Sequence, residues 1–310
     1  MLIVKNCKLM DMVDVDGEIR DIYINKEGKF ELVEKNIDPS SYPDAKVIDA
    51  EERLVTPGFV EPHCHMGVYE TGIREGMDGN ETTNPAVPGL RAIDAIDPMD
   101  AAYDVAIRHG VTTVVTGPGS SNIIGGTYAA MKTAGNILDK ALIKDELMMK
   151  TALGENPKMN YGRRGKAPKT RMMSAAILRE KLFEAKEYYE EYKSLKEQGE
   201  EEKLDYDHGL HSLMRVFDGM KLKIHAHQAD DILTGIRIAE EFGLRYTIDH
   251  CSEGYLIADV LKEKNVQCIL GPTVGGKGKY ESRNKSLESA AILEAEGVDF
   301  AIMTDHPVIP

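Results

Sequence analysis

Two histidines separated by one residue stand in the segment Val60-Glu61-Pro62-His63-Cys64-His65-Met66-Gly67. The apolar run before them, residues 54–59, is typical of a buried strand. Side chains on a strand alternate between two faces, so His63 and His65 point the same way and Cys64 points the other. The two imidazoles lie about 7 Å apart along such a strand, which suits two ligands of one divalent ion. A pair of surface histidines is the competing interpretation of so short a motif.

Further histidines and carboxylates follow other runs that are typical of strands. Imidazole and carboxylate groups are ligand types that suit zinc and similar divalent ions. Because barrel enzymes carry their chemistry at the C-terminal ends of the strands, we expect these side chains to meet in one metal site. The alternative is that these are unrelated polar residues that share no site. The candidates are His63, His65, Glu155, His225, His227, His250 and Asp305.

Some of these residues have a second interpretation. His227 shares a strand face with His225, so one of them can bind metal while the other orients a substrate. Glu155 stands shortly before Pro157 and can equally be an acid at the start of a helix. Three cations in predicted loops are candidates for binding a substrate carboxylate, although loop cations are more often solvated. They are Arg163, Arg171 and Lys277.

Strands that alternate with helices must position these residues. From residue 54 on, apolar and β-branched runs alternate with helical segments, the pattern of parallel βαβ units. The eight strand-like runs lie at about 54–64, 111–116, 127–133, 147–154, 222–227, 244–248, 266–270 and 298–304. They predict an α/β fold, a (β/α)₈ barrel of the TIM type over residues 56–310, with a helical excursion at 156–221. Shorter strand-like runs in residues 1–55 predict a small β portion ahead of it.

Composition excludes several classes of protein. The net charge of −14, from 38 basic and 52 acidic residues among 310, argues against a nucleic-acid or anionic-membrane partner. An apolar run of 18 residues does not occur, so no membrane span is predicted, and the N-terminal layout is not that of a signal peptide. Four scattered cysteines without a C-x-x-C pair predict reduced thiols in a cytoplasmic protein. Homo-oligomerisation is left open.

Four segments in this order resemble the motifs of the amidohydrolase superfamily, and most closely those of its imidazolonepropionase-related branch. The resemblance covers about residues 46–310. It implies a metal-dependent barrel that hydrolyses C–N bonds, with a side β-sandwich formed from both chain ends. The four segments are 55–65 (VTPGFVEPHCH), 223–231 (KIHAHQADD), 249–254 (DHCSEG) and 304–307 (TDHP).

The resemblance also implies metal ligands, carried over position by position. His63, His65 and Asp305 would hold the first metal, together with His225. Zinc is the expected metal, with one or two ions, and manganese or iron is the alternative.

A second metal would be served by Glu155, His225 and His250, or these residues would be alternative ligands and substrate-orienting groups in a one-metal enzyme. Many relatives use a carbamylated lysine on strand four. The nearest lysine here, Lys150, has the opposite parity to Glu155, so we expect it to point away from the site and prefer Glu155. A bulge in that strand would overturn this preference.

The leading hypothesis is a hydrolase that uses metal-activated water on an amide, a cyclic amide or an amidine. Asp305 would act as general base and then general acid, and His250 or His227 would stabilise the oxyanion. Candidate substrates are imidazolonepropionate, a short dipeptide with a terminal carboxylate, or a purine- or pyrimidine-like ring that is deaminated. The loops 67–96, 156–172 and 271–285, which would select among them, contain no readable pattern.

A second hypothesis is a metal- or ligand-binding protein without catalysis, against which the presence of Asp305 argues. Relatives continue beyond strand eight, whereas this sequence ends at Pro310. We therefore expect either a fragment of a longer protein or a small β portion that is completed in another way. An uncovered sheet edge would favour association.

Overall fold

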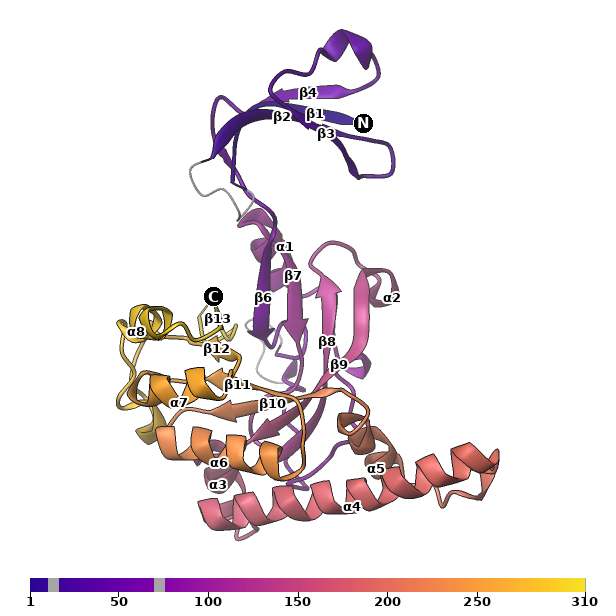
Figure 1. Cartoon of the computed structure of the whole chain (residues 1–310), viewed down its shortest axis with the longest axis vertical. Coiled ribbons are helices and arrows are strands. Elements are labelled where there is room, and N and C mark those ends of the chain that lie inside the picture. Colours follow the sequence, from indigo (N-terminus) through magenta and orange to yellow (C-terminus); the bar gives the residue numbers. More distant parts are fainter. Residues whose placement is uncertain (11–16, 70–75, 310) are drawn as a thin grey trace. The chain divides into compact units, whose positions relative to one another are not determined.

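The structure is a computed structural model that describes residues 1–10, 17–69 and 76–309. The chain divides into two compact units, Met1–Phe59 and Val60–Pro310. Figure 1 labels most of their strands and helices. All candidate site residues belong to the second unit. Within the described ranges, none of the helices is both long and apolar enough to cross a bilayer.

The first unit is a five-stranded sheet. Its strands are β1 (Leu2–Leu9), β2 (Glu18–Ile24), β3 (Phe30–Glu34), β4 (Lys46–Asp49) and β5 (Leu54–Val55), with the short 3₁₀ helix η1 (Pro39–Ser41) before β4. The order is β3-β2-β1-β4, and β5 also pairs with β1. Pairing is antiparallel among β1, β2 and β3, while β4 and β5 run parallel to β1. Ile3, Tyr23 and Ile37 form one of its two small apolar clusters.

The second unit is organised around an eight-stranded sheet. Its strands are β6 (Phe59–Cys64), β7 (Val111–Thr116), β8 (Ile124–Lys132), β9 (Leu142–Ala152), β10 (Lys221–Ala226), β11 (Tyr246–His250), β12 (Cys268–Leu270) and β13 (Phe300–Ile302). They follow one another in the sheet in chain order. All eight predicted strands are therefore present, and the barrel prediction is confirmed.

One strand departs from the predicted pattern of parallel units. β8 runs antiparallel to both β7 and β9, whereas the strands from β9 to β13 are parallel to their neighbours. The reason is the connection, because β7 and β8 are joined by residues 117–123 alone. A parallel crossover needs a dozen or more residues, so this short link can only reverse the chain. The expected βα alternation is therefore wrong at β8.

The first and last strands approach each other, so the sheet is a nearly closed barrel. The backbone N–H of His65 donates to the carbonyl oxygen of His306 at 2.9 Å. The carboxylate of Glu61 accepts hydrogen bonds from the backbone N–H and the hydroxyl of Thr304, at 2.9 and 2.8 Å. These bonds place the end of β6 beside the segment that follows β13, which carries Asp305.

Helices lie between most of these strands along the chain. They are α1 (Ala101–Arg108), α2 (Leu138–Ala141), α3 (Glu155–Gly162), α4 (Arg171–Gln198), α5 (His208–Leu213), α6 (Ala229–Glu241), α7 (Ala258–Glu263) and α8 (Ser289–Glu296), with 3₁₀ helices η3 (Ala92–Asp94), η4 (Glu201–Lys203), η5 (Met214–Val216), η6 (Gly254–Ile257) and η7 (Tyr280–Ser282). The long helix α4 begins at the N-cap Thr170, whose hydroxyl accepts from the N–H of Met173. It ends at Gly199, where φ is +68°, a conformation that favours glycine.

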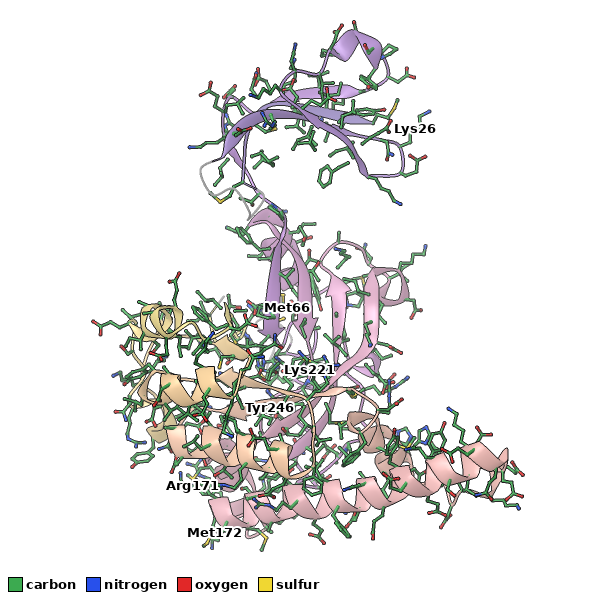
Figure 2. All side chains as sticks on the ribbon, viewed as in Figure 1. Lys26, Met66, Arg171, Met172, Lys221 and Tyr246 are labelled. Atoms are coloured by element: carbon green, nitrogen blue, oxygen red, sulfur yellow. The ribbon has the colours of Figure 1, made fainter. Side chains whose placement is uncertain are left out.

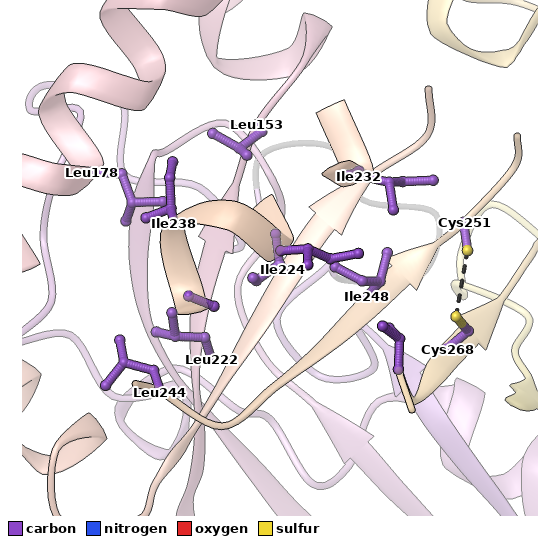
Figure 3. Packing of buried hydrophobic residues seen from close by; sticks show 14 of the residues in the cluster. Leu153, Leu178, Leu222, Ile224, Ile232, Ile238, Leu244, Ile248, Cys251 and Cys268 are labelled. Carbon is purple, nitrogen blue, oxygen red and sulfur yellow. Dashed lines mark hydrogen bonds between the residues drawn. The ribbon is translucent and has the colours of Figure 1, made fainter. Parts of the chain in front are cut away.

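The largest apolar core lies between helices such as α4 and α6 and the parallel strands (Figure 3). Leu178 of α4 and Ile238 of α6 are both fully buried, as are Leu222 and Ile224 of β10. Burial of side chains of this size stabilises the fold by about 1.5–3 kcal/mol each. This packing fixes β10 and β11, whose ends carry three of the candidate histidines. Cys64 and Cys251 lie in apolar clusters.

Candidate metal centre

Five histidines gather at one edge of the barrel. His63 is in β6 with His65 just after it, His225 is in β10 with His227 just after it, and His250 ends β11. The ring centroids of His225 and His227 are each 4.4 Å from that of His250, and the ring of His63 is 5.3 Å from it. All five side chains are buried. The structure thus brings together the histidines that the sequence placed at strand ends.

Asp305 joins this group from the segment after β13. Its Oδ1 lies 3.3 Å from Nε2 of His63 and 3.2 Å from Nε2 of His65. Potential ligand atoms of His63, His250 and Asp305 all lie within 4.8 Å of one another. Burial by itself raises the pKa of Asp305, but His63 and His65 facing it hold that pKa well below its usual value. The carboxylate is therefore ionised at neutral pH.

The hydrogen bonds of the His65 and His250 rings show which nitrogen of each ring is free to bind a metal ion. Nδ1 of His65 lies 2.8 Å from the carbonyl oxygen of Gly117, and Nδ1 of His250 lies 2.9 Å from that of Gly271. Because a carbonyl oxygen only accepts, each Nδ1 must carry the hydrogen and each neutral ring keeps a lone pair on Nε2. This is how proteins orient metal-binding histidines.

Nε2 of His65 therefore presents a lone pair to the carboxylate of Asp305. Oδ1 of Asp305 is buried and has no hydrogen-bond partner among the residues that the structure describes. Two acceptors that face each other at 3.2 Å repel unless a positive charge lies between them. A proton in that position is what holds the pKa of Asp305 low, and a divalent cation there would attract both groups. The donor set thus fits a divalent metal ion.

Behind His63 lies a buried charged network that the sequence had not suggested. Oδ2 of Asp249 is 3.0 Å from Nδ1 of His63 and 3.1 Å from Nζ of Lys150, and Oδ1 is 2.9 Å from Nζ of Lys223. All four side chains are fully buried. Burial raises the pKa of Asp249, but Lys223, His63 and Lys150 together hold it well below its usual value. Burial and Lys150 lower the pKa of His63 to about 4, so this ring is neutral at pH 7.

The position of Lys150 corrects an expectation. We expected it to point away from the site because its parity is opposite to that of Glu155. The strand β9 ends at Ala152, however, and Glu155 belongs to α3, so strand parity cannot be counted across the two residues. Lys150 contacts Asp249 inside the barrel, and burial lowers its pKa.

Tyr128 of β8 lies next to His63 and His65. Its hydroxyl donates to the carbonyl oxygen of Pro118 at 2.9 Å and lies 3.5 Å from Nε2 of His63 and 3.4 Å from Nδ1 of His65. Burial, with Asp249 second, raises its pKa well above the usual value, so the phenol stays neutral. A Cβ at Gly117 would lie 2.7 Å from the tyrosine ring, which explains a glycine at that position.

A second group surrounds His225 and His227, whose potential ligand atoms lie within 4.8 Å of those of His250. Oε1 of Glu281, in η7, is 3.6 Å from Nε2 of His225 and 3.7 Å from Nε2 of His227. Burial by itself raises the pKa of Glu281, but His225 and His227 lower it to about 2. This acid comes from the loop 271–285, in which the sequence showed no pattern.

Glu155, the acid predicted for this group, lies beside Glu281. It is the first residue of α3, as its second interpretation supposed. Its Oε2 accepts from the backbone N–H of Glu281 at 3.0 Å, and its own N–H donates to Oε2 of Glu281 at 2.8 Å. It is in neither of the two groups of potential ligands described above, and its predicted role as a ligand stays a prediction.

The histidines open into a pocket of about 880 Å³. Arg163, one of the three cations predicted to bind substrate, is among its lining residues. Arg171 is not. It lies at the start of α4 (Figure 2), and its Nη1 forms ion pairs with Asp230 and Asp231. Lys277 is not a lining residue either, although its neighbours in the loop are. The basic lining residues are Arg163, Arg164, Lys279 and Lys285.

Sequence reasoning missed part of this site, although some signals were available. By strand alternation, Lys223 shares a face with His225, which would have placed a lysine inside the barrel. Asp249 directly precedes His250 in a recognised motif, but simple alternation would send it to the other face. Tyr128 and Glu281 follow no spacing rule that the sequence displays.

Comparison with known proteins agrees with this geometry. No family model matches the chain. The crystal structure of an amidohydrolase from Thermotoga maritima MSB8 is 36% identical and superposes with a TM-score of 0.94, over 100% of this chain and 80% of that one. Amidohydrolase tasK of Hapsidospora irregularis is 34% identical over 168 residues, 49% of this chain and 17% of that protein. A dihydroorotase of Elusimicrobium minutum is 25% identical over 200 residues, 59% of this chain and 45% of that protein.

The chain belongs to the amidohydrolase superfamily, as its four motifs predicted. It spans less than half the length of the two curated relatives named here. Neither their names nor that of the Thermotoga protein refers to imidazolonepropionate. Membership of the imidazolonepropionase-related branch therefore stays a prediction.

Proposed function

We propose that this protein hydrolyses a C–N bond in a small amide, cyclic amide or amidine, using one or two divalent ions, with zinc as the first candidate. The observation that carries this proposal is the carboxylate of Asp305, which faces the lone pair of His65 and the ring of His63 at the mouth of a pocket. The relative named dihydroorotase acts on dihydroorotate, a cyclic amide. This supports cyclic amides as the first substrates to test.

His63, His65 and Asp305 would hold the first ion, with His225 or His250 beside them. A bound divalent ion acts as a Lewis acid and lowers the pKa of water from 15.7 to about 7. Asp305, whose pKa is held low, accepts the proton of the attacking water. It then delivers this proton to the leaving nitrogen.

The ring tautomers distinguish the roles of His227 and His250. His250 donates from Nδ1 to a carbonyl oxygen, so its neutral ring cannot donate from Nε2 and suits metal binding. Nδ1 of His227 lies 2.8 Å from the hydroxyl of Ser252, which can itself donate and so leave the hydrogen on Nε2. Burial and His225 lower the pKa of His227 to about 3. We assign His227 to the substrate, as a neutral donor to its developing oxyanion.

The pocket lining supports a substrate with an anionic group. Arg163 and Lys279 line it together with Arg164 and Lys285, whereas its lining acids are Glu155 and Asp305. Asp305 faces the histidines, so Glu155 is the one remaining lining acid against four lining cations. A guanidinium group binds a carboxylate through two parallel hydrogen bonds. Dihydroorotate and imidazolonepropionate both carry a carboxylate group. A dipeptide with a free C-terminal carboxylate is the second candidate substrate.

Turnover by an Asp305→Asn variant tests the proposal. The zinc- or manganese-loaded protein is assayed on dihydroorotate, dihydrouracil and imidazolonepropionate. We expect hydrolysis of at least one of them and a fall in kcat by about 10²–10⁴-fold in the variant, because the proton acceptor is lost. Asp299→Asn, at an exposed site, is the control and should leave kcat unchanged. Full turnover by the Asp305→Asn protein would contradict the assignment.

A further inference from the structure

A second pocket lies where the strands β10 and β11 begin, whereas the candidate metal centre lies where they end. Its volume is about 560 Å³, and its lining comes from β9, from the turn that leads into β10, and from the residue before β11. Lys221, labelled in Figure 2, is the first residue of β10. His225 stands four residues further along this strand, which corresponds to about 13 Å. The second pocket is therefore separate from the metal centre.

Cations outnumber acids in the lining of this second pocket, although the chain as a whole carries a net charge of −14. The lining cations are Lys144, Arg215, Lys221 and Arg245, and the lining acids are Glu146 and Asp218. Arg215 forms an ion pair with Glu146, which leaves three cations against Asp218. A hollow lined mainly by one sign of charge concentrates ions of the opposite sign. The second pocket therefore favours an anion.

Two of these cations have neutral partners and lie near each other. Nζ of Lys221 donates to Oε1 of Gln267 at 2.6 Å. Nη1 of Arg245 donates to the carbonyl oxygen of Gly219 at 3.4 Å. Neither cation forms an ion pair within the described part of the chain. Burial lowers the pKa of Lys221 and Arg245 lowers it further, while Asp299 opposes them. A bound anion would relieve the repulsion between the two cations.

The chemistry of the lining suits a phosphate group that is attached to an organic group. A guanidinium group binds phosphate through two parallel hydrogen bonds, and an ammonium group adds a compact point charge. Leu147, Met148 and Met220 line the same pocket and give an organic group apolar side chains to contact. The volume of about 560 Å³ is in the range that accommodates small-molecule ligands.

We propose that the second pocket binds the phosphate group of a small molecule, with Lys221 and Arg245 as the residues that hold it. Inorganic phosphate and a phosphate monoester share this chemistry. The proposal does not depend on the hydrolase reaction, because the second pocket has no lining residue in common with the pocket at the metal centre. Binding can therefore be measured without turnover.

Titration calorimetry on the full chain tests this proposal, with inorganic phosphate, AMP and adenosine as the probes. We expect saturable binding of AMP or phosphate and no binding of adenosine. A Lys221→Met, Arg245→Met double variant should lose affinity by about tenfold or more, because two charged hydrogen-bond donors are removed. Lys262→Met is the matched control, since Nζ of Lys262 also donates to a neutral oxygen, the carbonyl of Gly297 at 2.7 Å, and its affinity should not change.

The two phosphate probes distinguish the sources of the ligand. Tighter binding of AMP than of phosphate supports a monoester, and equal affinity supports the free anion. Failure of the wild type to bind either probe would overturn the proposal, and so would binding of adenosine as tightly as AMP. Equal affinity in the wild type and the double variant would place the binding elsewhere and would also overturn it. If the double variant does not fold by circular dichroism, Arg245→Gln, at an exposed position, replaces it, and unchanged affinity in that variant would contradict the proposal.

Discussion

At the scale of single residues, Asp249 connects the metal centre to two buried lysines. It lies against Nδ1 of His63 and within 3.1 Å of the ammonium groups of Lys150 and Lys223. The carboxylate thus orients His63, which we propose as a metal ligand, and neutralises part of the charge of the lysines. A carboxylate behind a metal-binding histidine holds the ring in place and raises its basicity.

We predict that Asp249→Asn lowers the free energy of unfolding by about 3–5 kcal/mol, the range for breaking a buried ion pair. The physical reason is that Lys150 and Lys223 would be left buried without a counter-charge. Urea unfolding of the metal-free protein measures this loss, with Asp299→Asn as a control. A variant as stable as the wild type would show that the two lysines are neutral and that Asp249 does not balance them.

Four of the five histidines of the site could be predicted from the sequence by strand alternation, and His250 is the exception. His63 and His65, and likewise His225 and His227, point the same way. Alternation fails after Asp249, because His250 has a φ of +69° and Cys251 a φ of +49°. This left-handed backbone turns His250 to the same side as Asp249. Such a conformation is rare for residues with a side chain, and the sequence gives no sign of it.

At the scale of elements, the positions of the strands could be predicted but the direction of one could not. Apolar, β-branched runs such as residues 111–116 mark a strand whichever way its neighbour runs. The reversal of β8 follows from the length of the link after β7. That length was readable, since even the ten residues 117–126 before the expected third strand are fewer than a parallel crossover needs.

The beginning of α6 allows a prediction of pH dependence. Asp231 is buried there, and burial raises its pKa to about 6 from 3.8, with Arg171 opposing the rise and Asp230 and Glu281 adding to it. Between these pH values the folded chain binds a proton that the unfolded chain releases, so Asp231 destabilises the fold as the pH rises. We predict that Asp231→Asn is more stable than the wild type at pH 8, by up to about 3 kcal/mol.

Urea unfolding of both proteins at several pH values measures this difference, which should vanish below about pH 4. Asp230→Asn is the control, since Asp230 is exposed and pairs with the same arginine. A difference that does not change between pH 4 and pH 8 would contradict the account of Asp231.

At the scale of the whole molecule, the charge of the pocket differs from that of the chain. The net charge is −14, yet four cations line the pocket. Composition gives only the net charge, and it could not show that distant segments of the chain collect cations around the candidate metal centre. The barrel was predictable because its strands repeat a pattern, whereas Arg163 and Lys279 line the same pocket only because distant segments of the chain fold together.

Bound metal per chain, in the wild type and in a His63→Ala, His65→Ala double variant, tests the central claim most directly. The protein is purified without chelator and analysed for zinc, manganese and iron. We expect one or two equivalents in the wild type and the loss of one in the variant, because His63 and His65 face Asp305 at the first site. Equal metal content in the two proteins, or no metal in the wild type after refolding with zinc, would contradict the claim.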